Sequence, residues 1–372
     1  MRVLVTGANG FIGKNLKMHL RERGGTEVVT FTREHSEVDL PILLEGVDWV
    51  FHLAGINRPE DPAEFVTGNV CLTQALCGAI KKSGRQIPVV YTSSTQVERD
   101  NDYGTSKRAA EDALLDLKES TGSAVYIYRL PNVFGKWARP NYNSAVATFC
   151  HNIARDLPVQ INDPDAAINL VYIDDVVASF LALMDGAKQS IPFAEVEPLY
   201  QITVGELESQ LQRFKATRDN LITEPVGTGL TRALYSTYVS YLPSERFIYS
   251  VPQHGDERGV FVEMLKTPDA GQFSFFTAHP GVTRGGHYHH SKTEKFLVIK
   301  GKACFRFRHM LTGEFYELHT TGEAAEIAET VPGWTHDITN EGDDELVCML
   351  WANEIFDRDN SDTFACPVGT KA

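Results

Sequence analysis

The start of this 372-residue chain is the feature that most constrains its fold. Residues 3–5 (VLV) have the composition of a short buried strand, and they run directly into TGANGFIG at residues 6–13. The three glycines of that segment permit a tight turn, and the helix expected after it, up to about residues 23–25, presents free N–H groups to a pyrophosphate. A glycine triplet alone is weak support, but its position between a strand and a helix favours a dinucleotide-binding turn.

The alternation of strands and helices continues along the N-terminal part of the chain. Apolar and β-branched segments predict strands at residues 27–31, 49–53 and 89–92, and residues 72–82 are expected to form a helix. Strands that alternate with helices predict a parallel, doubly wound sheet. We therefore expect an N-terminal Rossmann domain of the α/β class over residues 1–245.

The end of the second expected strand bears on the choice of cofactor. A site that prefers NAD has an acidic side chain here, which binds the ribose 2′-hydroxyl. The sequence instead reads Phe31-Thr32-Arg33, and the Arg33 guanidinium could meet a 2′-phosphate. This favours NADPH; the alternative is that Arg33 is only a solvated loop residue.

A tyrosine and a lysine four residues apart give the strongest catalytic signal. Tyr103 and Lys107 would lie on one face of a helix, where the ammonium favours the phenolate and lowers the tyrosine pKa from about 10 towards neutrality. Such a tyrosine can protonate a carbonyl while a nicotinamide delivers hydride. The preceding strand ends in Thr92-Ser93-Ser94, so a serine hydroxyl can bond the same oxygen. The spacing alone is common, but its combination with the glycine turn is specific.

The character of the sequence changes after Pro252. Short alternating strands, turn glycines and little helix predict a small all-β barrel or sandwich over residues 246–372. Before it, a helix is expected from about residue 206 to 217, and residues 234–243 (LYSTYVSYLP) are rich in aromatic and β-forming side chains. We interpret this last segment as structure that joins the two domains.

Four residues of the C-terminal part have the pattern of a metal site. His287 and His289 alternate on one strand and so share a face, and a turn at residues 290–293 brings Glu294 onto the returning strand. His336, after a Pro-Gly turn, can join them from a neighbouring hairpin. Three imidazoles and one carboxylate suit a first-row divalent metal ion with room for water or substrate. His290 is expected on the other face and is not a predicted ligand.

Composition narrows the class of protein. The formal net charge of −14, without a block of like charge, argues against nucleic acid and anionic membranes as partners. Six scattered cysteines without a C-x-x-C pair favour a reduced, cytoplasmic setting, and we expect neither a signal peptide nor a membrane span. His52 is interpreted as a packed strand-end residue, and Asp174 and Asp175 as charges at a helix N-terminus.

Several motifs in the first 240 residues resemble the extended short-chain dehydrogenase/reductase family that acts on nucleotide sugars. They are TGANGFIG, HLAG (52–55), TSS (92–94), YGTSK (103–107), RLPNVFG (129–135) and YIDDVV (172–177). The resemblance implies Tyr103 as the acid/base, Lys107 as its partner and Ser94 as the polarising hydroxyl. Only nine positions separate Ser94 from Tyr103, fewer than in many relatives, which leaves Ser93 as the alternative.

The same resemblance implies binding residues. Those implied at the cofactor site are Gly7, Asn9, Gly10, Phe11, Ile12, Gly13, Arg33, Leu53, Ala54 and Gly55, with Tyr103 and Lys107. Those implied as substrate contacts are Asn132, Lys136, Asn141, Asn143 and Arg258.

The C-terminal part resembles the cupin family. Gly281, His287, His289, Glu294 and Gly301 match the spacing of its first motif, and Pro332, Gly333, His336 and Asn340 match the second with one residue fewer between proline and glycine. Residues 256–263 and 284–290 are also similar to cupin sugar epimerases. In those enzymes the histidine at the position of His287 is a base, whereas here it is expected to bind metal.

The whole chain resembles the CapF-type bifunctional enzymes of bacterial capsular polysaccharide synthesis. That resemblance implies a UDP-linked 2-acetamido-2,6-dideoxy-4-hexulose as substrate, C3 epimerisation in the cupin domain, and C4 reduction to a UDP-6-deoxy-L-talosamine-type product on the route to UDP-N-acetyl-L-fucosamine. It also implies zinc and a homodimer. The alternatives are a reductase with a structural, non-catalytic cupin, a sugar-nucleotide sensor or scaffold, and a metal-dependent oxygenase.

Overall fold

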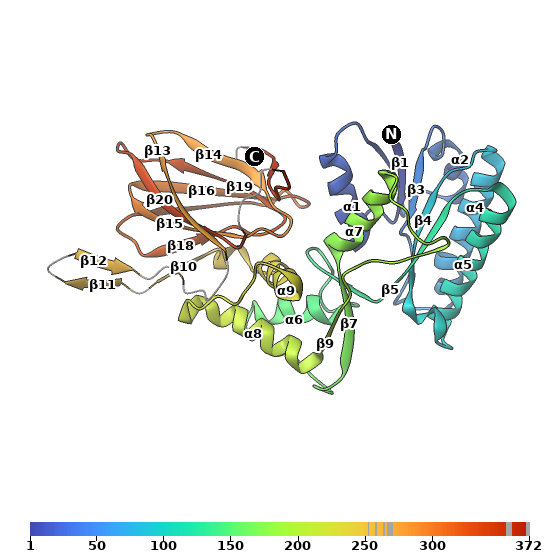
Figure 1. Ribbon diagram of the computed structural model, residues 1–372, viewed down its shortest axis with the longest axis horizontal. Helices are drawn as coiled ribbons and strands as arrows, with labels where there is room; N and C mark the ends of the chain where they lie inside the picture. Colours follow the sequence, from blue (N-terminus) through green and yellow to red (C-terminus); the bar gives the residue numbers. More distant parts are fainter. Residues whose placement is uncertain (252, 257–258, 263–264, 266–270, 355–358, 370–372) are drawn as a thin grey trace. The chain divides into compact units, whose positions relative to one another are not determined.

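The computed structural model describes residues 1–251, 253–256, 259–262, 265, 271–354 and 359–369. The chain forms two compact units (Figure 1). Unit 1 contains residues 1–144 and 168–202, and unit 2 contains residues 145–167 and 203–372. Within the described residues no helix is long and apolar enough to cross a membrane.

Unit 1 is built on a six-stranded sheet in which every neighbouring pair is parallel. Its order is β2 (Glu27–Phe31), β1 (Arg2–Thr6), β3 (Trp49–His52), β4 (Val89–Ser94), β5 (Val125–Leu130) and β8 (Phe193–Ala194). The buried strands are rich in Val, Leu, Ile and Phe, as in parallel sheets covered on both faces. This confirms the expected doubly wound α/β fold.

Helices cover both faces of this sheet. α1 (Phe11–Glu22) and α7 (Ile173–Met184) lie together on one face, and α4 (Leu72–Ser83) and α5 (Asp102–Thr121) lie on the other (Figure 1). The shorter helical segments are η1 (Glu37–Asp39), α2 (Leu40–Leu43), α3 (Ala63–Phe65), η2 (Val66–Cys71) and η3 (Thr95–Glu98). A separate sheet contains β6 (Asn132–Phe134), β7 (Ala167–Tyr172) and β9 (Tyr200–Thr203).

Unit 2 contains two five-stranded antiparallel sheets. One has the order β10 (Ile248–Ser250), β18 (Glu326–Glu329), β15 (Glu294–Lys300), β20 (Leu346–Ala352) and β13 (Gln272–Ala278). The other has the order β17 (Phe315–Thr321), β16 (Lys302–His309), β19 (Trp334–Asn340), β14 (Thr283–Tyr288) and β21 (Phe364–Ala365). A hairpin of β11 (Gln253–Asp256) and β12 (Gly259–Val262) accompanies them. The expected all-β character of the C-terminal part is confirmed.

Three helices and a short helical turn complete unit 2. α6 (Ala145–Ile153), α8 (Val204–Asn220) and α9 (Gly229–Ser240) pack against one another, and η4 (Ser244–Arg246) precedes β10. α6, α8 and α9 all end before residue 245 but belong to unit 2, so the compact units do not coincide with a linear division at that residue. The domain boundary at residue 245 remains a prediction. The β-forming residues after position 233 are mostly helical in α9. Every residue from Ala233 to Val239 is buried, so packing outweighs local propensity there.

Candidate functional site

The glycine turn of unit 1 depends on close backbone packing. Gly10 precedes the first residue of α1, and its N–H donates to the carbonyl of Gly7 at 2.8 Å. Gly7 has a φ of 66°, and a Cβ there would lie 2.6 Å from the nitrogen of Ala54. A Cβ on Gly13 would lie 2.3 Å from the Gly7 oxygen. Larger residues would therefore displace the turn that opens α1, as expected for a turn that lets a ligand approach the backbone.

The loop after β3 is held by a hydrogen-bond chain through His52. The Ala54 N–H donates to Thr6 Oγ1 at 3.2 Å, and the Thr6 hydroxyl lies 2.7 Å from His52 Nδ1. His52 Nε2 lies 2.8 Å from Thr73 Oγ1, which donates to the carbonyl of Asn69 at 2.6 Å. Because Thr73 donates onward, it accepts from Nε2–H, and Nδ1 is the acceptor. Burial lowers the pKa of His52 to about 3, so this packed imidazole is neutral.

Tyr103 lies in the first turn of α5, beside the end of β4. Asn101 caps that helix by accepting from the Gly104 N–H at 2.8 Å. The Tyr103 hydroxyl is hydrogen-bonded to Ser94. Ser93 instead donates to the buried Glu111 carboxylate at 2.5 Å. The structure therefore brings Ser94, and not Ser93, to the tyrosine.

Lys107 lies one turn further along α5 and is buried. Its Nζ donates to the carbonyl of Thr92 at 2.9 Å and lies 4.8 Å from the ring centre of Tyr91. Burial lowers the pKa of Lys107 to about 8, with Glu111 acting in the opposite direction. Burial raises the pKa of Tyr103, and the Ser94 bond partly offsets this effect. The expectation that Lys107 lowers the tyrosine pKa is wrong for the protein alone, because desolvation of the phenolate dominates.

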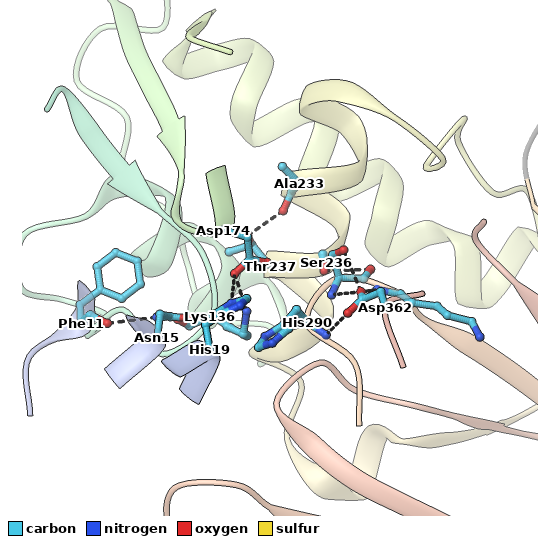
Figure 2. Close-up of polar contacts among 12 residues, drawn as sticks. Phe11, Asn15, His19, Lys136, Asp174, Ala233, Ser236, Thr237, His290 and Asp362 are labelled. Atoms are coloured by element: carbon cyan, nitrogen blue, oxygen red, sulfur yellow. Dashed lines mark hydrogen bonds and ion pairs between the residues drawn. The ribbon is translucent and has the colours of Figure 1, made fainter. Parts of the chain in front are cut away.

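The other residues implied at the cofactor site surround the glycine turn. Asn9 is exposed and accepts from Lys17 Nζ at 3.1 Å. Phe11 and Ile12 are the first residues of α1, and the Phe11 carbonyl accepts from Asn15 Nδ2 at 3.0 Å (Figure 2). Leu53 and Gly55 lie in the loop after β3, and a Cβ on Gly55 would lie 3.1 Å from Lys107 Nζ. Arg33 is exposed in the turn that follows β2.

The residues implied as substrate contacts have different surroundings. Asn132 is exposed in β6, and Asn141 and Asn143 are exposed before α6. Lys136 is buried, and its Nζ lies 2.8 Å from Asp174 Oδ1 (Figure 2). Asp174 and Asp175 occupy the first turn of α7, as expected for charges at a helix N-terminus. Arg258 lies outside the described residues.

The four predicted metal ligands converge in unit 2. His287 ends β14 with Tyr288, His289 follows that strand, Glu294 begins β15, and His336 in β19 is paired in register with His287. One potential ligand atom from each lies within 4.8 Å of all the others. Glu294 Oε2 lies 3.1 Å from His289 Nε2 and 3.4 Å from His336 Nε2. The ring centres of His287 and His336 are 4.7 Å apart.

The protonation states of this group suit a cation. Burial lowers the pKa of His287 to about 3 and also lowers the pKa of His336. Burial by itself would raise the pKa of Glu294, but hydrogen bonds from His289 and His336 hold it well below its ordinary value. His336 Nδ1 is buried and lacks a hydrogen-bond partner among the described residues. The neutral His287 and His336 imidazoles, together with His289 and the Glu294 carboxylate, form a donor set that fits a first-row divalent ion.

Another group with potential ligand atoms combines one buried cysteine with two exposed residues. Cys304, His319 and Glu341 also have one such atom each within 4.8 Å of the others. The His319 side chain is 58% exposed and forms ion pairs with Glu341 at 2.8 Å and Glu317 at 3.4 Å. Burial raises the pKa of the Cys304 thiol to about 12. We interpret this group as surface ion pairs, since its imidazole already has two carboxylate partners.

Sequence reasoning missed two residues beside the histidine group. The Lys292 Nζ lies 2.9 Å from Glu294 Oε1, on the carboxylate oxygen that the histidines leave free. The Asp362 carboxylate accepts from the His290 N–H at 2.8 Å (Figure 2). Lys292 lies within the motif and could have been noticed from its spacing. Asp362 is distant in sequence from the motif, and no local pattern marks it. His290 is not one of the four clustered residues, as predicted.

Comparison with known proteins identifies both parts of the chain. Residues 3–193 match the NAD dependent epimerase/dehydratase family, and residues 254–364 match the polysaccharide biosynthesis C-terminal domain. The UDP-2-acetamido-2,6-beta-L-arabino-hexul-4-ose reductase of Pseudomonas aeruginosa is 67% identical over 372 residues, 100% of each chain. The crystal structure of the capsular polysaccharide assembling protein CapF from Staphylococcus aureus has 38% identity and a TM-score of 0.68, over 99% of this chain and 100% of that one.

The chain belongs to the NAD dependent epimerase/dehydratase family, in its CapF type. A nicotinamide cofactor is the rule in this family. The UDP-glucuronic acid 4-epimerase of Bacillus cereus, solved with NAD, is 22% identical with a TM-score of 0.53, over 58% of this chain and 85% of that one. At that identity the likeness shows only the dinucleotide-binding fold of unit 1.

Proposed function

We propose that this protein acts twice on one UDP-linked 4-keto sugar, by epimerisation at C3 in unit 2 and by NADPH-dependent reduction at C4 in unit 1. The observation that carries the proposal is the presence of two chemically different groups in one chain. In unit 1, Tyr103 is a potential proton donor whose hydroxyl is bonded to Ser94, and Lys107 lies one helical turn away. In unit 2, His289 and Glu294 belong to a buried group suited to a cation. The name of the Pseudomonas aeruginosa relative supports the reductase half and the sugar class.

In unit 1, Tyr103 is the proposed proton donor to the C4 oxygen. Because burial raises its pKa, the tyrosine keeps its proton at neutral pH, as a donor must. Ser94, bonded to the same hydroxyl, would hold the ketone oxygen in place. Lys107, fixed by the Thr92 carbonyl, supplies a positive charge close to the loop at Gly55. The nicotinamide cofactor, when bound, would supply the hydride.

NADPH is the proposed form of the cofactor. The segment at the end of β2, Phe31-Thr32-Arg33, has no acidic residue, and Arg33 is exposed. A guanidinium there suits a 2′-phosphate better than a ribose hydroxyl.

In unit 2, we propose a cupin-type site that holds zinc through His287, His289, Glu294 and His336. When bound, the ion supplies a Lewis acid to the C4 carbonyl, which acidifies the hydrogen at C3. The chain buries the site, holds the His287 and His336 imidazoles neutral and keeps the Glu294 carboxylate ionised. Lys292 forms an ion pair with Glu294 Oε1, and Glu294 Oε2 faces the histidines.

The order of the two reactions follows from chemistry. The hydrogen at C3 is acidic only while C4 is a ketone, so inversion at C3 must precede reduction at C4. The proposed product is a UDP-6-deoxy-L-talosamine-type sugar on the route to UDP-N-acetyl-L-fucosamine. A homodimer is expected as well, and light scattering at several protein concentrations would test it.

Solvent deuterium exchange tests the division of labour. The 4-keto sugar nucleotide is incubated with protein in D₂O without NADPH, and deuterium at C3 is measured by mass spectrometry and NMR. We expect uptake with the wild type and with Tyr103→Phe, and none with His289→Ala. His290→Ala, which changes the neighbouring histidine outside the group, is the matched control and should keep the uptake.

The same variants distinguish this proposal from the alternative, a reductase with a structural, non-catalytic cupin. In that case no variant, nor the wild type, would introduce deuterium at C3, while NADPH oxidation with a ketosugar would persist in His289→Ala. Loss of uptake in Tyr103→Phe would instead locate both reactions in unit 1.

A further inference from the structure

The loop between two proposed ligands is bound by one distant carboxylate. Residues 290–293 connect His289 to Glu294, and three consecutive N–H groups of this loop point at Asp362. The distances to its carboxylate oxygens are 2.8 Å from the His290 nitrogen and 2.7 Å from the nitrogens of Ser291 and Lys292. The Ser291 hydroxyl adds a fourth bond at 3.0 Å, and Figure 2 shows Asp362 beside the loop. One side chain therefore satisfies four donors.

The backbone of the same residue orients a proposed ligand. The His289 Nδ1 is hydrogen-bonded to the carbonyl oxygen of Asp362. A carbonyl can only accept, so Nδ1 carries a proton, and Nε2 is the nitrogen that can offer a lone pair to a cation. That nitrogen is the one that lies 3.1 Å from Glu294 Oε2, inside the group. Asp362 thus selects the tautomer that presents a donor atom to a cation.

Other contacts hold the opposite side of the loop. The Ser291 carbonyl accepts from Ser236 Oγ at 3.1 Å and from Asn353 Nδ2 at 3.3 Å. The Thr293 N–H donates to Asn353 Oδ1 at 2.9 Å. These partners come from α9 and from the chain after β20, so the loop stays attached when the carboxylate is removed. Loss of the carboxylate would leave three N–H groups without their acceptor while the fold of unit 2 is retained.

We propose that Asp362 is a positioning residue that fixes His289 and the loop up to Glu294 in the geometry that binds the metal ion. This inference rests on the proposed function, because it assumes that the four-residue group holds zinc. Residues that orient metal ligands typically contribute about 10–100-fold to metal affinity. Asp362 acts on two ligands through one loop, so we expect an effect within that range.

Metal affinity is the measurement that tests this role. The full chain is stripped of metal, and zinc affinity is measured by competition with a chromophoric chelator for the wild type, Asp362→Asn and Asp362→Ala. Asp343→Asn is the matched control, since it removes the same charge from an exposed position of unit 2. We expect both Asp362 variants to bind zinc about 10–100-fold more weakly, and the control to bind as the wild type does.

A spectroscopic signature distinguishes positioning from a general effect on folding. Cobalt(II) in place of zinc reports coordination geometry through its visible absorption, and Asp362→Asn should change the shape and intensity of that spectrum. NADPH binding by unit 1 should be unchanged. Equal zinc affinity and an equal cobalt spectrum in folded Asp362→Asn would overturn the inference, as would unfolding of both variants, since Asp362 would then serve folding only. If the wild type binds no zinc, the proposed function itself fails.

Discussion

Glu329 is the centre of a buried ion network that joins the helices of unit 2 to its sheets. It lies in β18 directly opposite Lys295 of β15, and the Lys295 Nζ is 2.8 Å from its carboxylate. Arg218 of α8 forms a second ion pair with it, and the Tyr235 hydroxyl of α9 donates at 3.0 Å. The side chains of Glu329 and Lys295 are each 1% exposed. We predict that Glu329→Gln strongly destabilises unit 2.

The magnitude follows from the number of cations left behind. At an effective dielectric constant of about 20, opposite charges 4 Å apart attract by roughly 4 kcal/mol, so two partners contribute about 8 kcal/mol. Against this, the substitution relieves the several kcal/mol that it costs to desolvate the carboxylate. The net loss in the free energy of unfolding should be about 3–5 kcal/mol, as when one partner of a buried pair is removed.

Scanning calorimetry at neutral pH measures this loss. For a unit of this size each kcal/mol lowers Tm by about 2–4 °C, so the transition of unit 2 should fall by roughly 6–20 °C. Glu345→Gln is the matched control, because that side chain is 48% exposed and, among the described residues, forms a long ion pair of 3.8 Å with the exposed His279. A drop below about 1 kcal/mol, or equal to that of the control, would refute the reasoning. Adding Lys295→Met to Glu329→Gln should recover part of the loss.

Three further predictions concern unit 1. The pKa of Lys107 is lowered to about 8, and a lysine is charged below its pKa. We therefore expect kcat/KM for ketosugar reduction to fall as pH rises through about 8. A flat profile up to pH 10 would show that the charge of Lys107 is not needed. Ser94→Ala should lower kcat by about 10²-fold or more with little change in Tm. Ser93→Ala, which removes one donor from the buried Glu111 but leaves its ion pair with Arg129, should chiefly lower Tm. Arg33→Ser should raise the KM for NADPH about tenfold or more and leave the KM for NADH unchanged. Equal effects on the two KM values would show that Arg33 is a solvated loop residue without a role in cofactor choice.

The fold of unit 1 could be predicted because its signals are local. The order of apolar strands and helices and the glycine turn at residues 6–13 each lie within a short stretch of chain. Parallel strands need helical connections, so that order leaves few topologies. The ends of strands were less accurate: β3 ends at His52, one residue before the expected end.

The convergence of the histidines and Glu294 was predicted in part from spacing, since a period of two fixes which residues of a strand share a face. His287 and His289 needed only that rule, and His336 needed the pairing of β19 with β14. The acid/base group was predicted less completely. The choice between Ser94 and Ser93 required the position of Glu111, which takes up the Ser93 hydroxyl. The pKa of Tyr103 required its burial, which no motif encodes.

The amino-acid sequence by itself determined the α/β and all-β character of the two parts, the glycine turn and the identity of the clustered histidines, because these follow from periodicity and short spacings. Only the tertiary structure decided that helices α6, α8 and α9 belong with the β-sheets, that Glu329 bonds to two cations, and that Asp362 holds the ligand loop. These arrangements depend on contacts between buried groups that lie far apart in the sequence. Burial, unlike a motif, is a property of the folded chain.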